Sequence, residues 1–254
     1  MAPKIEFLDV YFMYGARQAK HEWVLNNFNL SIGNGEFHVL LGPSGCGKST
    51  VLNLVAGFER PTTGQVRVNG APVNGPGVDR VVIFQSSDSL YPWLTAIENV
   101  EFGLRIARVP RTQRRDRARS FLRLVGLDGQ DKKFPCQLSG GMKHRVQLAR
   151  ALAGRADTLL MDEPFGALDA QTRSLLQAEL VQLWRQTGYT AVFVTHDVTE
   201  AILLADRVSV MTTGPGAALK ETVSVSLGRP RSVAQPEFGD LYIRLNRLLG
   251  KEAA

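Results

Sequence analysis

Cysteine, long apolar runs and a leader segment are scarce or missing in this sequence. Its 254 residues include two cysteines, Cys46 and Cys136, which form no Cys-x-x-Cys pair and have no histidines nearby at metal-ligand spacing. A disulfide framework or a zinc site is therefore not expected, and a reducing compartment is the default. No apolar run approaches the roughly 18 residues that a membrane helix needs. The N-terminus has no charged head before an apolar stretch, so a secretory signal is not expected either.

Charge of either sign is also not in large excess. The formal net charge is +6, and a hydrophobic content of 44% is typical of a globular protein with a sizeable core. The densest basic run is helical in pattern, and we interpret it as a solvated face, near lipid headgroups, in preference to a nucleic-acid groove. No nucleic-acid partner is therefore expected. The run comprises Arg105, Arg108, Arg111, Arg114, Arg115, Arg117, Arg119 and Arg123.

Strand and helix patterns alternate along the chain and predict an α/β fold in a single functional domain, residues 1–254. We expect residues 1–85 and 158–225 to form a β-rich core, and residues 86–157 to form a helical subdomain inserted in it. In the tail, residues 226–254, apolar residues recur at helical spacing. This predicts a terminal helix packed on its own domain, with a partner-binding helix as the alternative. The apolar residues are Phe238, Leu241, Tyr242, Leu245, Leu248 and Leu249.

The stretch GPSGCGKS, residues 42–49, matches the phosphate-loop pattern Gly-x-x-x-x-Gly-Lys-Ser in full. Glycines let backbone N–H groups turn towards phosphates, and a helix that begins near Lys48 adds its positive dipole end. Lys48 supplies a charge to the β- and γ-phosphates, and the Ser49 hydroxyl can ligate Mg²⁺. The predicted nucleotide-binding residues here are Gly42, Pro43, Ser44, Gly45, Cys46, Gly47, Lys48, Ser49 and Thr50.

The stretch TLLMDEP reads as a buried strand with two carboxylates at its end. Ligands bind at the carboxyl ends of parallel strands. We therefore expect Asp162 to hold Mg²⁺, directly or through water, and Glu163 to polarise the attacking water as the general base. A helix cap is the alternative for an Asp-Glu pair that stands alone. A GTPase is not favoured, because the guanine-reading motif Asn-Lys-x-Asp is absent.

With the stretch QLSGGMK, residues 137–143, the chain resembles the ATP-binding subunits of ABC transporters over almost its whole length. GPSGCGKST is similar to their Walker A loop, LSGG to their signature, LLMDEP to their Walker B motif, GALD to their D-loop and VTHD to their switch-histidine segment. The resemblance implies a P-loop NTPase core with a predominantly helical insert and an antiparallel β edge. A small-molecule phosphate-loop kinase would leave the signature, the D-loop and the switch histidine unexplained.

The resemblance also implies roles for residues outside the phosphate loop. Gln85, the glutamine of IFQ, falls at the Q-loop and would contact Mg²⁺ or water. His196 would hydrogen-bond the γ-phosphate and the attacking water, and would thus be catalytic together with Glu163. Asp169 stands in the D-loop at the nucleotide site.

In this family two ATP-binding subunits meet head to tail, and each ATP lies between one subunit's phosphate loop and its partner's signature. The resemblance therefore implies that Ser139, Gly140 and Gly141 reach the ATP of a second copy. The residues agree, because LSGG opens a helical run whose N–H groups and dipole suit an anion. Met142 departs from the glutamine that most members have, and we expect function to survive because the serine and the glycines carry the phosphate contacts.

Tyr14 stands where the family has an aromatic residue that stacks on adenine. Such base stacking contributes ~1–3 kcal/mol in other systems. Phe12 or Tyr11 could fill that place instead, because the following segment ARQAKHEW makes the alignment loose here.

The segment that follows the Q-loop glutamine carries a cluster of apolar residues, Tyr91, Pro92, Trp93 and Leu94. Exposure of such a cluster is costly, so it is either buried in the helical insert or lines a groove. In the family this region grips a coupling helix of the transmembrane subunit. Several stretches, PWLTAIENV among them, look like the importer branch for taurine, aliphatic sulfonates, nitrate and related small anions, with taurine uptake the nearest resemblance.

The resemblance implies an ATPase that uses ATP and Mg²⁺, pairs with a second copy of itself and works on two transmembrane permease subunits. A periplasmic or lipid-anchored solute-binding protein would deliver the solute. The chain would be peripheral, at the cytoplasmic face of a bacterial inner membrane. Nitrate or another small substrate is the alternative to taurine. The alternative class is a soluble ABC ATPase in repair, cluster assembly or translation, which usually brings a coiled-coil insertion, a tandem unit or no docking element.

Overall fold

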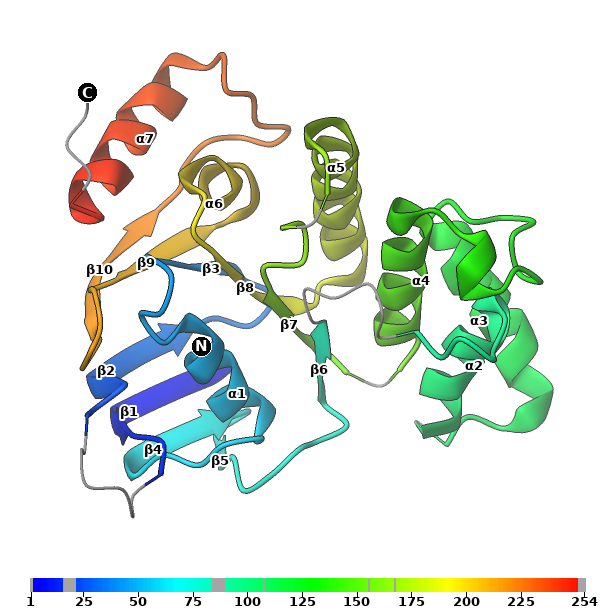
Figure 1. Cartoon of the computed structure of the whole chain (residues 1–254), viewed down its shortest axis with the longest axis horizontal. Helices are drawn as coiled ribbons and strands as arrows, with labels where there is room; N and C mark the ends of the chain where they lie inside the picture. Colours follow the sequence, from blue (N-terminus) through cyan, green and yellow to red (C-terminus); the bar gives the residue numbers. More distant parts are fainter. Residues whose placement is uncertain are drawn as a thin grey trace. The chain divides into compact units, whose positions relative to one another are not determined.

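The computed structural model describes residues 2–15, 22–83, 90–106, 108–154, 156–166 and 168–250. The chain forms two compact units, the first made of Met1–Gly77 and Thr190–Ala254 and the second of Val78–Tyr189. Figure 1 shows strands and helices interspersed along the chain. The predicted α/β class is therefore confirmed.

The first unit contains a four-stranded sheet with the order β2-β1-β4-β5, in which all neighbours are antiparallel. Its strand β2 exposes Asn29 and Ser31 and buries Phe28 and Leu30, the alternation expected of a sheet with one solvated face. The strands are β1 (Ile5–Phe12), β2 (Leu25–Ile32), β4 (Thr63–Val68) and β5 (Ala71–Pro72). The antiparallel β region expected from the family resemblance is thus present in the fold.

The same unit contains strands that carry the nucleotide motifs. Strand β3 (Phe37–Leu41) is parallel to β8 (Thr190–Thr195) on one side and to β9 (Arg207–Met211) on the other. All residues of β3 and β8 are buried, which explains their continuous apolar runs. Strand β10 (Leu219–Ser224) adds to β9 in the antiparallel direction.

Three helices complete the first unit: α1 (Lys48–Ala56), α6 (Val198–Leu204) and α7 (Pro236–Leu248). Helix α6 packs on β3 and β8, and α7 packs on α6, as Figure 1 shows at the C-terminal end of the chain. Phe238 and Leu245 form the buried side of α7, while Tyr242 and Ile243 are exposed. This is the packing that the apolar spacing of the tail predicts for a helix held by its own domain.

The second unit combines two parallel strands with four α-helices among its described residues. Helices α2, α3 and α4 pack against one another, and α4 also contacts β6; Figure 1 shows α2, α3 and α4 as neighbours. The elements are β6 (Arg80–Ile83), α2 (Ala96–Ile106), α3 (Arg111–Leu124), the 3₁₀ turn η2 (Pro135–Gln137), α4 (Gly140–Ala153), β7 (Thr158–Asp162) and α5 (Ala170–Thr187). Across the described residues of both units, no helix is long and apolar enough to span a bilayer.

Candidate functional site

The phosphate loop joins the buried strand β3 directly to helix α1, which begins at Lys48 as the sequence predicts. Gly45 and Gly47 have φ angles of 79° and 90°, in the left-handed region that glycine adopts at little cost. Gly47 is the N-cap of α1 and provides no side-chain cap. The first N–H groups of α1 are therefore left for an anion, which a nucleotide phosphate can supply.

Lys48 lies inside the loop and is 5% exposed. Its Nζ donates hydrogen bonds to the carbonyl oxygens of Gly42, at 2.9 Å, and Pro43, at 2.7 Å. These two contacts hold the ammonium group within the loop, on the carbonyl oxygens of its first two residues. A point charge on a flexible stem can exchange a carbonyl for a phosphate.

Cys46 is buried within the same loop, and its Sγ lies where a side chain at Gly42 would have to go, 2.7 Å from the ideal Cβ position. Burial raises the pKa of the Cys46 thiol above its ordinary value, and the nearby Lys48 charge only partly opposes this. The thiol is therefore a packing group in the loop, and it gives Gly42 a steric reason to be glycine.

The three aromatic candidates for adenine stacking differ in exposure. Phe12 is buried, and Tyr11 packs edge-on against Trp23 with 5.5 Å between ring centroids. Tyr14 is 54% exposed, and its hydroxyl is 3.2 Å from the Oγ1 of Thr50 in the first turn of α1. Of the three, Tyr14 is the most exposed and lies beside the phosphate loop, with its ring supported by a T-shaped contact with Phe12, so it is the candidate that the structure favours.

His196 follows strand β8 directly and is exposed. Leu41 of β3 pairs with Thr195 of β8, so Gly42 and His196 leave neighbouring parallel strands at the same edge of the sheet. The next residue, Asp197, caps α6 by accepting hydrogen bonds from the backbone of Thr199 and Glu200. His196 is thus held between a buried strand and a capped helix, on the edge where the phosphate loop begins.

In the second unit, Asp162 ends the buried strand β7 and Glu163 follows it. Glu163 has a φ of 42°, a left-handed conformation that is uncommon for a residue with a side chain. Its carbonyl accepts a hydrogen bond from Gly166 N at 3.1 Å, which closes a tight turn. Backbone strain of this kind gathers at functional sites. Gln85, predicted for the Q-loop, lies outside the described residues.

The signature forms the start of helix α4, as predicted: Ser139 is the N-cap and Gly140 the first helical residue. The Ser139 hydroxyl accepts a hydrogen bond from Met142 N at 3.3 Å, and its own proton remains available to an acceptor. Ser139 and Gly140 are exposed, and a Cβ at Gly140 would meet nothing within 4 Å. An anion can therefore reach the N–H groups at this helix start.

The D-loop residue Asp169 lies beside the signature. Asp169 is the N-cap of α5 and accepts a hydrogen bond from Thr172 N at 3.0 Å. Hydrogen bonds from the Thr172 backbone and side chain lower the pKa of the Asp169 carboxyl. A Cβ at Gly141 would lie 3.3 Å from Thr172 Cγ2, so the starts of α4 and α5 adjoin, and the second unit brings the signature and the D-loop together.

Two residues that matter to the second unit carried no signal in the sequence. Asn99 is fully buried on α2; its Oδ1 accepts from Tyr91 N at 2.9 Å and its Nδ2 donates to Leu94 O at 3.0 Å. His144 is buried on α4, with its ring 5.3 Å from that of Phe165 in the turn after Glu163. His144 contacts a more distant segment, whereas Asn99 holds the loop just before its own helix, and helical periodicity reveals neither contact.

Asn99 anchors the apolar segment Tyr91–Leu94, for which the sequence left two interpretations open, burial in the helical insert and a docking surface. Trp93 is 69% exposed, whereas Tyr91 is half-buried against Phe102, with 4.6 Å between centroids. The Arg150 guanidinium lies 5.6 Å from the Tyr91 ring centroid. The loop is thus rigidly anchored but presents a large aromatic side chain to solvent, an arrangement that fits docking of a partner.

The burial of His144 has a consequence for stability against acid. Desolvation lowers the His144 pKa from 6.5 to about 4. Between these two pH values the unfolded chain binds a proton at His144 and the folded chain does not. Stability that is complete above pH 6.5 should be lost as the pH falls towards 4, by about 3 kcal/mol in total. His144→Gln removes this titration, and urea unfolding at several pH values should show a flatter profile than that of the wild type.

The buried histidine His38 provides a useful reference for this measurement, because burial lowers its pKa as well and the variant retains it. Some dependence on pH should therefore persist in His144→Gln. An unchanged profile in that variant would mean that His144 does not stay neutral in the folded protein.

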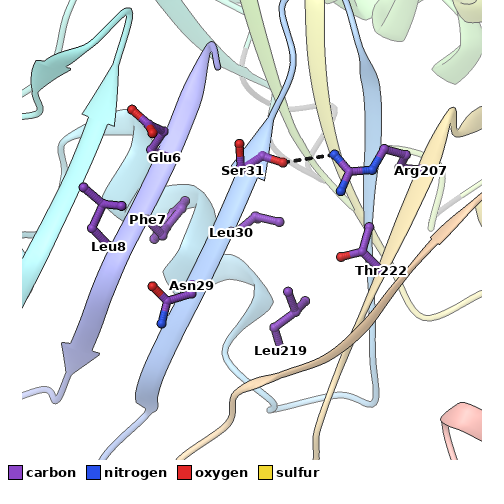
Figure 2. Close-up of a pocket in the computed structure, with 9 residues that line it drawn as sticks. All are labelled: Glu6, Phe7, Leu8, Asn29, Leu30, Ser31, Arg207, Leu219 and Thr222. Carbon is purple, nitrogen blue, oxygen red and sulfur yellow. Dashed lines mark hydrogen bonds between the residues drawn. The ribbon is translucent and has the colours of Figure 1, made fainter. Parts of the chain in front are cut away.

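A cavity of about 350 Å³ also lies in the first unit, and Figure 2 shows the residues that line it. Arg207 Nη1 donates to Ser31 O at 3.2 Å and lies 3.5 Å from Glu36 Oε2. Glu36 in turn hydrogen-bonds the buried His38 at 2.6 Å. The phosphate loop contributes no residue to the lining, so this hollow is distinct from the nucleotide-binding loop.

The donors predicted for Mg²⁺ are oxygen atoms, the Ser49 hydroxyl in the first turn of α1 and the Asp162 carboxylate at the end of β7. Ser49 is exposed and Asp162 half-buried, so both can be reached. Mg²⁺ commonly takes one or two such protein ligands, with phosphate oxygens and waters completing its octahedron. Taken singly, each of these two donors is of the kind that a magnesium ion bound to a nucleotide accepts.

Comparison with known proteins gives consistent results. A sequence profile described as ABC transporter matches residues 25–166. Taurine import ATP-binding protein TauB of Chromobacterium violaceum is 52% identical over 77% of this chain and 75% of that protein. Bicarbonate transport ATP-binding protein CmpD of Synechocystis sp. is 50% identical over 82% of this chain and 74% of that protein. A dimeric post-hydrolysis structure of the ATP-binding cassette MJ0796 with ADP and Pi aligns with a TM-score of 0.73 at 32% identity, over 88% of this chain and 100% of that chain.

Proposed function

The chain belongs to the ABC transporter family and is an ATPase of that family, and from this premise we propose that it powers the import of a small anionic solute through a separate transmembrane permease. One observation carries the proposal: the chain has two helix starts suited to phosphate, at Gly47 before α1 and at Ser139 before α4. One ATP needs only one phosphate loop. The second helix start is accounted for if it serves the ATP of a second copy.

The proposed chemistry is hydrolysis of the γ-phosphate by water. The N–H groups of α1 and Lys48 would hold the phosphates, and Ser49 with Asp162 would hold Mg²⁺. When bound, Mg²⁺ neutralises charge that develops on the phosphate oxygens. Glu163 would accept the proton of the attacking water, and His196 would orient that water and the γ-phosphate. Gln85 and Asp169 are proposed as further groups at this site.

Pairing with a second copy is supported by the relative MJ0796, which was solved as a dimer. Here the Ser139 hydroxyl and the N–H groups of Gly140 and Gly141 would contact the partner's γ-phosphate. ATP would then hold the two copies together, and hydrolysis would remove the contacts that join them. Tyr14 would stack on the adenine of the ATP in its own phosphate loop.

The solute is proposed from the relatives. One is named for taurine import and another for bicarbonate transport, and both solutes are small and carry an acidic group. We propose taurine or another sulfonate as the solute, with nitrate or another small anion as the alternative. The exposed Trp93, held in place by Asn99, would dock the permease at the cytoplasmic face of the membrane. A solute-binding protein outside that membrane would complete the importer.

Growth of the source organism tests the solute. Deletion of the gene should abolish growth on taurine as sole sulfur source, while growth on sulfate should continue. The wild-type gene should restore growth on taurine and Glu163→Gln should not, because transport requires turnover. Loss of growth on a longer alkanesulfonate alone, or on nitrate as nitrogen source, would replace taurine with that solute. Unchanged growth on all of them would contradict the proposed solute class.

A further inference from the structure

The largest concentration of charge on the chain lies in α3 and at the end of α2. Residues 105–123 contain eight arginines and a single acidic residue, Asp116, so this segment alone is more positive than the +6 of the whole chain. None of these arginines belongs to the phosphate loop, the signature, the D-loop or the segment Tyr91–Leu94. Their function is therefore not explained by ATP hydrolysis.

Four of these residues form a continuous row. Arg111, Arg115, Arg119 and Arg123 follow one another at intervals of four along α3, so they share one side of the helix. All four are exposed. Helix α3 packs against α2 and α4, and its buried residues are Ala118 and Leu122, not the arginines. We refer to Arg111, Arg115, Arg119 and Arg123 as the arginine row.

The arginine row works against the stability of its own helix. Like charges four residues apart destabilise a helix, and the row contains three such pairs in succession. Arg111 is the first residue of α3, where the helix dipole disfavours a cation, and no acidic residue occupies that first turn. A chain selected for the stability of α3 alone would not be expected to place arginine at these positions.

Charges within the chain neutralise the row only in part. Arg115 Nη1 lies 3.4 Å from Glu101 Oε1, and Arg119 lies 3.7 Å from Asp131 and 3.9 Å from Asp116. These pairs are long and their arginines are exposed, so they contribute little. In the described part of the chain, Arg111 and Arg123 form no ion pair. The row therefore retains positive charge for an external anion.

We propose that the arginine row binds an anionic phospholipid surface. Guanidinium groups match phosphate in geometry and are only weakly hydrated. A line of exposed arginines meets many headgroup phosphates at once, and basic residues near a cytoplasmic leaflet are attracted to its anionic lipids. A single-stranded nucleic acid would need aromatic side chains between the basic ones, but the only aromatic residue of α3, Phe121, is half-buried.

The inference rests on the proposed function for one point, that the chain works beside a membrane. Lipid binding itself requires neither ATP nor the permease. Lipid binding and the proposed function can therefore fail separately: an inactive ATPase can bind vesicles, and an active ATPase can fail to bind them.

The test uses the purified full-length chain and flotation with large unilamellar vesicles, made either of phosphatidylcholine alone or with about one third phosphatidylglycerol. The test variant replaces the row by glutamine, Arg111→Gln, Arg115→Gln, Arg119→Gln and Arg123→Gln. The matched control removes the same number of exposed charges from other elements: Arg60→Gln, Arg185→Gln, Lys220→Gln and Arg247→Gln. Thermal unfolding and ATPase rates of both variants show whether each is folded.

The wild type should bind the anionic vesicles and should not bind the neutral ones, and its binding should weaken as salt is added. The row variant should bind at least about twentyfold more weakly, because each arginine near an anionic surface contributes about fivefold and the loss of only two such contacts already gives that factor. The control should lose far less. Equal losses in both variants, or absence of wild-type binding, would overturn the proposal. Preference of the wild type for a short RNA over the anionic vesicles would also overturn it, in favour of a nucleic-acid partner.

Discussion

Glu163→Gln is expected to lower the rate of ATP hydrolysis by about 10²–10⁴-fold, the usual contribution of a positioned general base, while ATP remains bound. Glutamine has the size and hydrogen-bonding reach of glutamate but cannot accept the proton of the attacking water. The phosphate loop that binds ATP is formed by β3, α1 and the residues between them. The substitution does not alter that loop, so binding and turnover should separate.

The backbone conformation at Glu163 should be the same in the glutamine variant. Its φ of 42° is strained for glutamate and for glutamine alike, since both carry a Cβ and a flexible side chain. The turn that follows is closed by the hydrogen bond from Gly166 N to the Glu163 carbonyl, which involves no side-chain atom of Glu163. The variant should therefore fold as the wild type does, and its thermal unfolding temperature should remain close to the wild-type value.

The measurement combines steady-state phosphate release with light scattering after gel filtration. With ATP, Glu163→Gln should elute as a stable dimer, because the ATP that joins the copies persists; with ADP it should be monomeric. Glu237→Gln removes the same charge from an exposed position in the first turn of α7 and should retain wild-type turnover. Hydrolysis by Glu163→Gln at near the wild-type rate would remove Glu163 from the role of base.

The parts of this site that could be predicted from the sequence are those that depend on neighbours along the chain. Gly45 and Gly47 set the turn of the phosphate loop, and α1 begins at Lys48, as the pattern indicates. Ser139 likewise starts α4 because a serine side chain can cap the N–H groups that follow it. These features involve a few residues each, and local chemistry decides them.

Other features depend on side-chain contacts that neither helical nor strand periodicity contains. The ring contact of His144 with Phe165 and the anchoring of Tyr91 by Asn99 join different elements. The choice of Tyr14 among three aromatic residues rests on its hydroxyl near Thr50 and on the burial of Phe12. Each of these requires knowledge of packing, which the sequence encodes only collectively.

Subdomain limits show the same difference between pattern and contact. The sequence pattern changes near residues 85 and 158, where strand-like runs give way to helical ones and return. By contacts, the chain divides between Gly77 and Val78 and again between Tyr189 and Thr190. Strands β6 and β7 and helix α5 thus group with the helices α2, α3 and α4. Periodicity reports the type of each element, whereas its neighbours in space decide the unit to which it belongs. The subdomain limits expected from the sequence remain a prediction.

Ser139→Arg is expected to abolish dimer formation with ATP while each copy still binds ATP. Ser139 is exposed at the start of α4, where the proposed γ-phosphate of the partner would lie. An arginine there fills that space, and its loss of the cap to Met142 N adds about 1 kcal/mol of local cost. Loss of a central contact of about 2 kcal/mol corresponds to roughly thirtyfold weaker association, and steric exclusion should exceed this.

The measurement is best made in the Glu163→Gln background, in which the dimer persists, with Ser139→Thr as the control that retains both hydroxyl and cap. A nucleotide analogue with a fluorescent label should bind the Ser139→Arg protein as tightly as the wild type, because that chain's own phosphate loop is unchanged. Normal dimerisation of Ser139→Arg would contradict a site shared between copies.

A mixture of two defective proteins gives the sharpest form of this test. A Lys48→Ala chain lacks its ATP site but has an intact signature, whereas a Ser139→Arg chain has the reverse. Neither should dimerise alone. Mixed together, they can form one composite site from the phosphate loop of the second and the signature of the first, so a heterodimer with one bound ATP should appear. Two independent sites within each chain would give no such recovery, because each protein would retain its own defect.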